Sequence, residues 1–424
     1  MNGAPKLVTA VAIAAAVVVC PGVATAAPPP GACGNPAPAS PAVTELPWAQ
    51  KTLDARSVHE HATGAGVVVA VVDSGVDADH PQLAGKVLRG QDFFLVGDLP
   101  GGFDCVSHGT GVASIIAARP VSGIGFAGLA PDATILPVRV SESDSTDGAA
   151  EGIDPEALAR GIWFAADHGA EVINLSVAGE LDNPFVRDAI RHAVDLDVVV
   201  VAAVGNGQEG TAPGPVTYPA GYDGVIGVGA VDMTGTRLDS SQIGPQVDVV
   251  APGGGVLCAA RAGGHQYRDG TSFAAPFVSA TAALVRSAWP GMSAREVTQR
   301  ILATTTPAPG DKAAYGTGMV NPYRALTDGL VSAAPAALPA VRHPVPDAEQ
   351  VRVSAWWAES VSDARLFAVL TVAVAVLGAG AAVVLIRGRR SRWQPRRAVV
   401  PPAAPARDEL PEEMFLVPPP PADR

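Results

Sequence analysis

Five apolar, largely β-branched runs alternate with helical patterns, and this alternation constrains the fold more than any other feature. The runs lie at residues 67–73, 133–140, 171–177, 197–206 and 224–232. They show little polar alternation, which is typical of strands buried on both faces. Helical patterns lie at residues 108–118, 155–168, 184–196, 271–288 and 294–303. The sequence therefore predicts an α/β fold of three layers, with a mainly parallel sheet between helices.

The composition agrees with one large folded domain, which we place at residues 63–330. The chain has 424 residues, of which 48% are hydrophobic and 17% charged, enough for a sizeable core. Its net charge is −12, and no basic stripe interleaved with aromatic residues precedes the C-terminal region. We therefore expect no nucleic-acid partner.

The N-terminus has the pattern of a secretory signal peptide over residues 1–26. Lys6 precedes an apolar run at 7–19, and Ala24-Thr25-Ala26 fits a cleavage site. The run is too short to span a bilayer as an anchor. A lipoprotein signal ending at Cys20 is the alternative, although the three valines before it are not the small residues expected there.

A second apolar segment, residues 366–386, predicts a transmembrane helix. It has 21 residues without a charge, a length of roughly 31 Å as a helix against a hydrocarbon core of about 30 Å. Arginines follow it directly, so the tail at 387–424 is expected to be cytoplasmic and the folded domain extracytoplasmic. That basic flank disfavours the alternative of a buried core helix. Residues 331–365 form a linker.

Three stretches each place one reactive side chain at a strand end or a helix start, among small residues. They are VVDSGVD with Asp73, SHGTGVASIIA with His108, and GTSFAAP with Ser272. Nucleophilic attack by serine needs a base and a carboxylate that orients it. A fourth stretch, Gly205-Asn206-Gly207, follows a strand, and Asn206 is a candidate donor to an oxyanion. Taken singly, such residues are usually turn formers, surface residues or helix caps; together they favour catalysis.

These motifs, in the order Asp, His, Ser, resemble the subtilisin-type serine proteases (subtilases) over roughly residues 60–330. The resemblance implies an endopeptidase without a cofactor, acting on protein or peptide substrates. By position, Asp73 would orient the base, His108 would be the general base, Ser272 the nucleophile and Asn206 the oxyanion donor.

The full layout resembles the mycosins, the membrane-anchored subtilases of actinobacterial type VII secretion systems. That resemblance implies a membrane complex of this system as the partner. One alternative is a structural subunit whose protease activity is dispensable; another, a general degradative protease, is disfavoured by the anchor.

The subtilase resemblance also implies where a substrate binds. In subtilases an extended peptide pairs with a strand edge, a form of β-augmentation. Carried over, this edge and the walls of the pocket for the residue before the cleaved bond (P1) comprise Leu175, Ser176, Val177, Ala178, Gly179, Ala202, Ala203, Val204 and Gly205. None is charged, which predicts a small to medium apolar P1 residue.

Three cysteines remain after signal removal, namely Cys33, Cys105 and Cys258. One disulfide can join only two of them. We favour Cys33 with Cys105, because a bridge would hold the N-terminal extension (residues 27–62) on the domain, and the mycosin resemblance implies such a tie. The extension is expected to remain as a wrap. No metal site is assigned: the calcium sites of subtilases lie in loops too variable to place in this sequence, and the acidic segment 142–154 lacks an EF-hand spacing.

Overall fold

The structure, a computed structural model, describes residues 30–95, 97–142, 153–330 and 371–390. Contacts divide the chain into two units, Met1–Ser332 and Ala333–Arg424, and each unit is described by itself below. The predicted signal peptide, the whole of the predicted linker, most of the tail and most of the acidic segment 142–154 lie outside the described residues.

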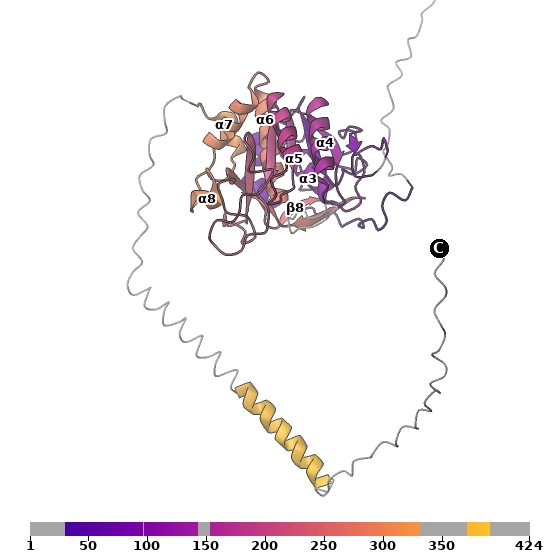
Figure 1. Cartoon of the computed structure of the whole chain (residues 1–424), viewed down its shortest axis with the longest axis vertical. Coiled ribbons are helices and arrows are strands. Elements are labelled where there is room, and N and C mark those ends of the chain that lie inside the picture. Colours follow the sequence, from indigo (N-terminus) through magenta and orange to yellow (C-terminus); the bar gives the residue numbers. More distant parts are fainter. Residues whose placement is uncertain (1–29, 96, 143–152, 331–370, 391–424) are drawn as a thin grey trace, which may run out of the picture. The chain divides into compact units, whose positions relative to one another are not determined.

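A seven-stranded parallel sheet forms the centre of the first unit, in the order β2-β3-β1-β4-β5-β6-β7. The predicted fold class is therefore confirmed. Figure 1 labels the main helices of this unit. The strands are β1 (Val68–Asp73), β2 (Gln91–Asp92), β3 (Thr134–Arg139), β4 (Val172–Leu175), β5 (Val199–Ala203), β6 (Val225–Val231) and β7 (Val249–Pro252). The edge strands β2 and β7 were not expected, because their two and four residues are too short to show a pattern.

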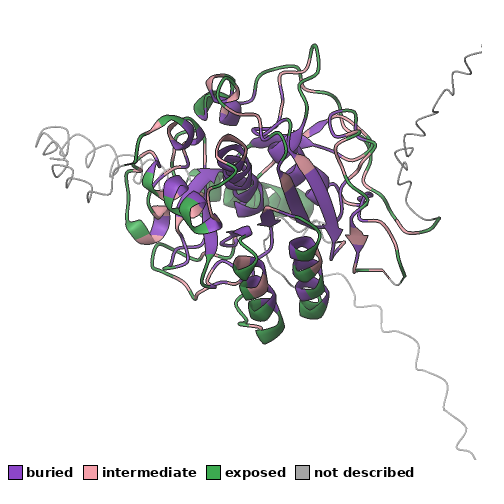
Figure 2. Ribbon diagram, turned by 90° about the horizontal axis from the view of Figure 1, so that it is seen from above, coloured by how far each residue is buried: buried purple, intermediate pink, exposed green. Residues whose placement is uncertain are grey.

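Helices cover both faces of this sheet. On one face lie α3 (His108–Ala117), α6 (Thr271–Ala288) and α7 (Ala294–Ala303); on the other, α4 (Pro155–Asp167) and α5 (Pro184–Asp195) lie side by side. Within β1, Val69 and Val71 belong to the core beneath α3 and α6, whereas Ala70 and Val72 belong to the core beneath α4 and α5. The strands are thus buried on both sides (Figure 2), which explains why their sequences lack polar alternation.

The N-terminal extension contributes to the core, which its proline-rich sequence did not indicate. It forms α1 (Trp48–Thr52) and α2 (Ala55–His59), and Ala49, Leu53 and Val58 are buried in the main core. Cys33 is bonded to Cys105, so the predicted disulfide is confirmed. A hairpin of β8 (Val256–Ala259) and β9 (His265–Arg268), with the short helices α8 (Lys312–Tyr315) and α9 (Pro322–Thr327), completes the unit.

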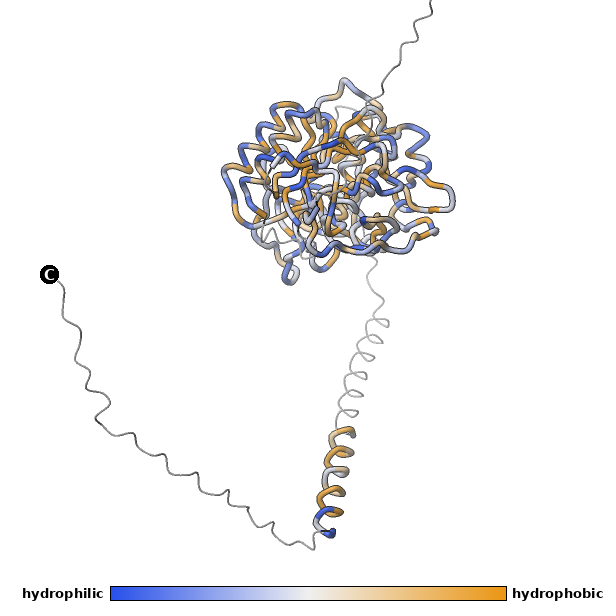
Figure 3. Tube along the Cα trace, turned by 90° about the vertical axis from the view of Figure 1, so that its right-hand side faces the viewer, coloured by the Kyte–Doolittle hydropathy of each residue, from blue (hydrophilic) through white to orange (hydrophobic). Residues whose placement is uncertain are grey.

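In the second unit the described residues form one helix, Thr371–Arg390, long and apolar enough to cross a membrane. It overlaps the predicted segment 366–386, whose first five residues lie outside the described ranges. Figure 3 shows that the helix is hydrophobic over most of its length and ends in hydrophilic residues.

Candidate active site

The fold brings the three reactive side chains to the carboxyl edge of the parallel sheet. Asp73 is the last residue of β1, an interior strand of the sheet between β3 and β4. His108 is the first residue of α3, and Ser272 is the second residue of α6. The carboxyl edge of an open α/β sheet is where ligands generally bind.

Asp73 and His108 form a buried pair. The Nδ1 atom of His108 lies 2.7 Å from Oδ1 of Asp73, and the main-chain N–H of Ser74 donates to the same oxygen, also at 2.7 Å. This contact places the ring proton on Nδ1 and leaves Nε2 as the basic nitrogen. Gly109 allows the approach, because a Cβ there would collide with the carbonyl oxygen of Gly75 and crowd Asp73.

The start of α6 lies beside this pair. The ring of His108 packs against that of Phe273, with 5.2 Å between ring centroids, and Phe273 directly follows Ser272. The Oγ of Ser272 donates to the carbonyl oxygen of Ser176 at 3.1 Å. The base His108 therefore packs against the residue next to Ser272, and both His108 and Ser272 are buried.

Asn206 is held against the same helix start. Its Oδ1 accepts from the N–H of Thr271 at 2.8 Å and from the Thr271 hydroxyl at 3.0 Å. These contacts make Nδ2 the donor end of the amide, and a Cβ on Gly270 would lie 3.0 Å from that nitrogen. The structure thus brings all four motif residues together, with an amide donor at the mouth of α6.

Sequence reasoning missed Asp104, which joins the elements that carry Asp73 and His108. Its buried carboxylate accepts from the hydroxyls of Ser74 and Thr110 and from the main-chain N–H groups of Val106, Ser107 and Thr110. Burial raises the pKa of Asp104, while the hydrogen bonds from Thr110 and Val106 oppose this shift. A detectable signal was present: Asp104 is the only charged residue between Asp98 and Arg119.

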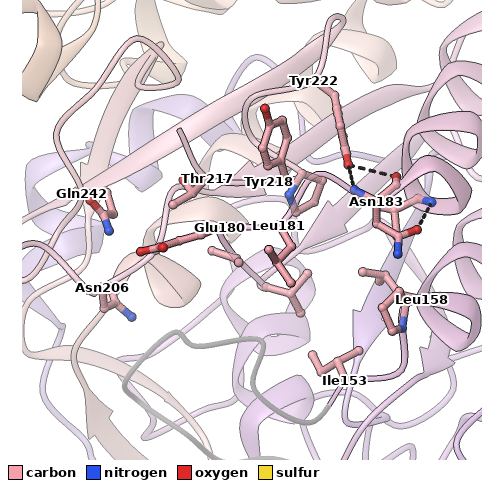
Figure 4. A pocket seen from close by; sticks show the side chains of 18 residues that line it. Ile153, Leu158, Glu180, Leu181, Asn183, Asn206, Thr217, Tyr218, Tyr222 and Gln242 are labelled. Atoms are coloured by element: carbon pink, nitrogen blue, oxygen red, sulfur yellow. Dashed lines mark hydrogen bonds between the residues drawn. The ribbon is translucent and has the colours of Figure 1, made fainter. Parts of the chain in front are cut away.

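A cavity of about 510 Å³ adjoins Asn206 (Figure 4). Four predicted substrate-binding residues line it, namely Val177, Ala178, Gly179 and Gly205. The other five are buried and lie outside its lining: Leu175, Ser176, Ala202, Ala203 and Val204.

Further lining residues had not been expected. Thr217, Tyr218 and Gln242 add polar groups, and among the described residues that line the cavity Glu180 is the only charged one. Within the residues that the structure describes, no group of three or more His, Cys, Asp or Glu side chains could hold a metal ion.

Comparison with known proteins agrees with this geometry. The model of the subtilase family (Peptidase_S8) matches residues 64–318. The chain belongs to the subtilase family. It is 38% identical over 263 residues to the thermophilic serine proteinase of Bacillus sp. (strain AK1), an alignment that spans 62% of each chain.

Solved subtilase structures are also similar. MycP3, described as a protease from the type VII (ESX-3) secretion system, is 31% identical, with a TM-score of 0.60 over 72% of this chain and 97% of its own. MycP1 from the ESX-1 type VII secretion system is 30% identical, with a TM-score of 0.62 over 71% of this chain and 91% of its own. This subtilase is a subtilisin-like serine endopeptidase, and its predicted resemblance to the mycosins is confirmed.

Proposed function

We propose that Ser272 is the nucleophile of this protease. Its Oγ attacks the carbonyl carbon of the scissile peptide bond while its proton passes to Nε2 of His108. The carboxylate of Asp73 stabilises the resulting imidazolium. The observation that carries this assignment is the 2.7 Å contact between Asp73 and a His108 ring that packs against Phe273, the residue directly after Ser272.

The developing oxyanion would be stabilised by Nδ2 of Asn206 and by the N–H groups at the start of α6. His108 then returns its proton to the leaving amine, and water hydrolyses the acyl-enzyme by the same route. Replacing Asn206 with alanine is expected to lower kcat by about 100- to 1000-fold, the range typical for one oxyanion donor.

The substrate is proposed to lie along the edge that ends in Val177, Ala178 and Gly179, with its P1 side chain in the adjoining cavity. The walls there are mostly apolar, with Glu180 as a charged exception, and this apolar majority supports the preference for a small to medium apolar P1 residue. Cleavage of a peptide library by the wild-type chain, with Ser272→Ala as control, tests this preference. Equal cleavage after lysine or arginine would contradict it.

The protease is further proposed to be a single-pass membrane protein, anchored through the helix Thr371–Arg390, with its catalytic domain extracytoplasmic. The apolar length of this helix supports the anchor, and the arginines at and beyond its C-terminal end support the orientation. Protease digestion of intact cells should remove the domain and spare the tail; protection of the domain would contradict the orientation.

The similarity to MycP3 and MycP1 supports a role in type VII protein secretion. We propose that the chain associates with the membrane complex of such a system and cleaves substrates there. A second candidate is a stabilising subunit of that complex with dispensable protease activity. Substrate export in a strain carrying Ser272→Ala separates the two, because unaffected export would favour the stabilising role.

A further inference from the structure

Pro276 leaves a gap in the hydrogen bonding of α6 at Ser272. In an α-helix the carbonyl of residue i accepts from the N–H of residue i+4. For Ser272 that residue is Pro276, which lies inside the helix and has no N–H. Ser272 is buried, so its carbonyl oxygen needs another donor.

A side chain from the sheet supplies that donor. The Oγ of Ser176, directly after β4, donates to the carbonyl oxygen of Ser272 at 2.7 Å. The same Oγ accepts from Nδ2 of Asn174 at 2.9 Å, which holds the hydroxyl in place while its own proton is donated to Ser272. The orientation of the Asn174 amide is set in turn by the hydroxyl of Ser279, which donates to Oδ1 at 2.8 Å.

These contacts join α6 to β4 and the residue after it at two positions along the helix, Ser272 and Ser279. Ser279 lies seven residues after Ser272 in α6, so the chain of bonds leaves the helix, passes through β4 and returns to the helix at Ser272. Asn174 and Ser279 are fully buried, and Ser176 is 5% exposed. Ser272 also donates its own hydroxyl to the carbonyl of Ser176.

We propose, on the basis that Ser272 is the nucleophile, that Ser176, Asn174 and Ser279 are positioning residues for it. They tie the main chain of Ser272 to the sheet edge where the substrate is expected to pair. The nucleophile is thereby placed relative to the bound peptide, and not only relative to its own helix. Loss of the tie should slow acylation while leaving substrate binding intact, because the main-chain edge and the cavity remain.

The test compares Ser176→Ala with a matched control, Thr281→Val, in the purified full-length chain. Thr281 of α6 likewise carries a buried hydroxyl, but within the described part of the chain its hydrogen bond goes to the carbonyl oxygen of Phe277 in the same helix. We expect Ser176→Ala to lower kcat on a peptide substrate by roughly 10- to 100-fold, with KM changed by less than about twofold. Thr281→Val should keep the wild-type kcat, and Ser176→Thr, which retains the hydroxyl, should stay within about threefold of wild type.

A second substitution provides a rescue that a general loss of packing would not show. Pro276→Ala restores an N–H four residues after Ser272, so the helix itself can satisfy the carbonyl. Added to Ser176→Ala, it should recover about tenfold in kcat and in the rate of labelling by a fluorophosphonate probe. If Ser176→Ala does not fold, Ser279→Ala, which removes only the outermost donor, is expected to lower kcat by about 3- to 10-fold.

Two outcomes would overturn the positioning role: a wild-type kcat in Ser176→Ala, or a folded double variant without rescue. Neither bears on the identity of the nucleophile. That assignment fails instead if Ser272→Ala retains proteolysis or if the probe labels another residue.

Discussion

Removal of the disulfide between Cys33 and Cys105 is expected to lower the free energy of unfolding by about 4 kcal/mol. The two cysteines are 72 residues apart. Closing a loop of that size removes about 15 cal/mol/K of entropy from the unfolded chain, which is about 4 kcal/mol at 25 °C. The folded extension keeps other ties, including main-chain bonds from Ala37 to Cys105 and from Ser40 to Gly263. The bridge therefore acts mainly on the unfolded state.

The assay is thermal unfolding of the wild-type chain and of Cys33→Ala/Cys105→Ala, followed by tryptophan fluorescence with and without reductant. A change of 1 kcal/mol moves the Tm of a domain of this size by about 2–4 °C, so we expect a fall of roughly 8–16 °C. Reductant should lower the Tm of the wild type to that of the variant and should leave the variant unchanged. Equal Tm values for the oxidised wild type and the variant would refute the reasoning.

Three further predictions concern buried polar groups. Arg139→Met should lower the free energy of unfolding by about 3–5 kcal/mol, because it leaves the buried carboxylate of Asp92 without its countercharge. In the wild type, Nη1 of Arg139 lies 2.9 Å from Oδ2 of Asp92, and both side chains are fully buried. A loss below about 1 kcal/mol in urea denaturation would contradict this. Asp104→Ala should lower kcat by about tenfold or more, because it removes the acceptor of five hydrogen bonds beside the Asp73–His108 pair; unchanged kinetics would exclude this role. Burial lowers the pKa of His265 to about 4, so between pH 6.5 and 4 the unfolded state binds the proton first and stability falls as the pH falls. His265→Gln should therefore flatten the dependence of Tm on pH in that window, and an unchanged slope would argue against it.

The sequence predicted those parts of the fold and site that depend on local pattern. Strands buried on both faces leave unbroken apolar runs, so β1 and β3 to β6 were visible. Asp73, His108 and Ser272 were visible because each stands among small residues at a chain reversal or a helix start. The disulfide followed from the number of cysteines, the need to hold the extension and the mycosin resemblance.

The remaining features depend on tertiary contacts. Leu53 and Val58 lie in a proline-rich segment, and only their tertiary contacts make them part of the core. The network from Ser279 through Asn174 depends on how α6 lies over β4, which no spacing within either element reveals. Glu180 reaches the cavity from just beyond the segment that the subtilase resemblance assigned to substrate binding.

The most direct test of the central claim is labelling of the purified full-length chain with a fluorophosphonate probe, read by intact mass and peptide mapping. A single adduct on Ser272 that is absent in Ser272→Ala, and much slower to form in His108→Ala, would show that the hydroxyl is activated by its neighbours. A folded wild-type chain that acquires no adduct, or acquires one on a different residue, would contradict the proposed catalytic site.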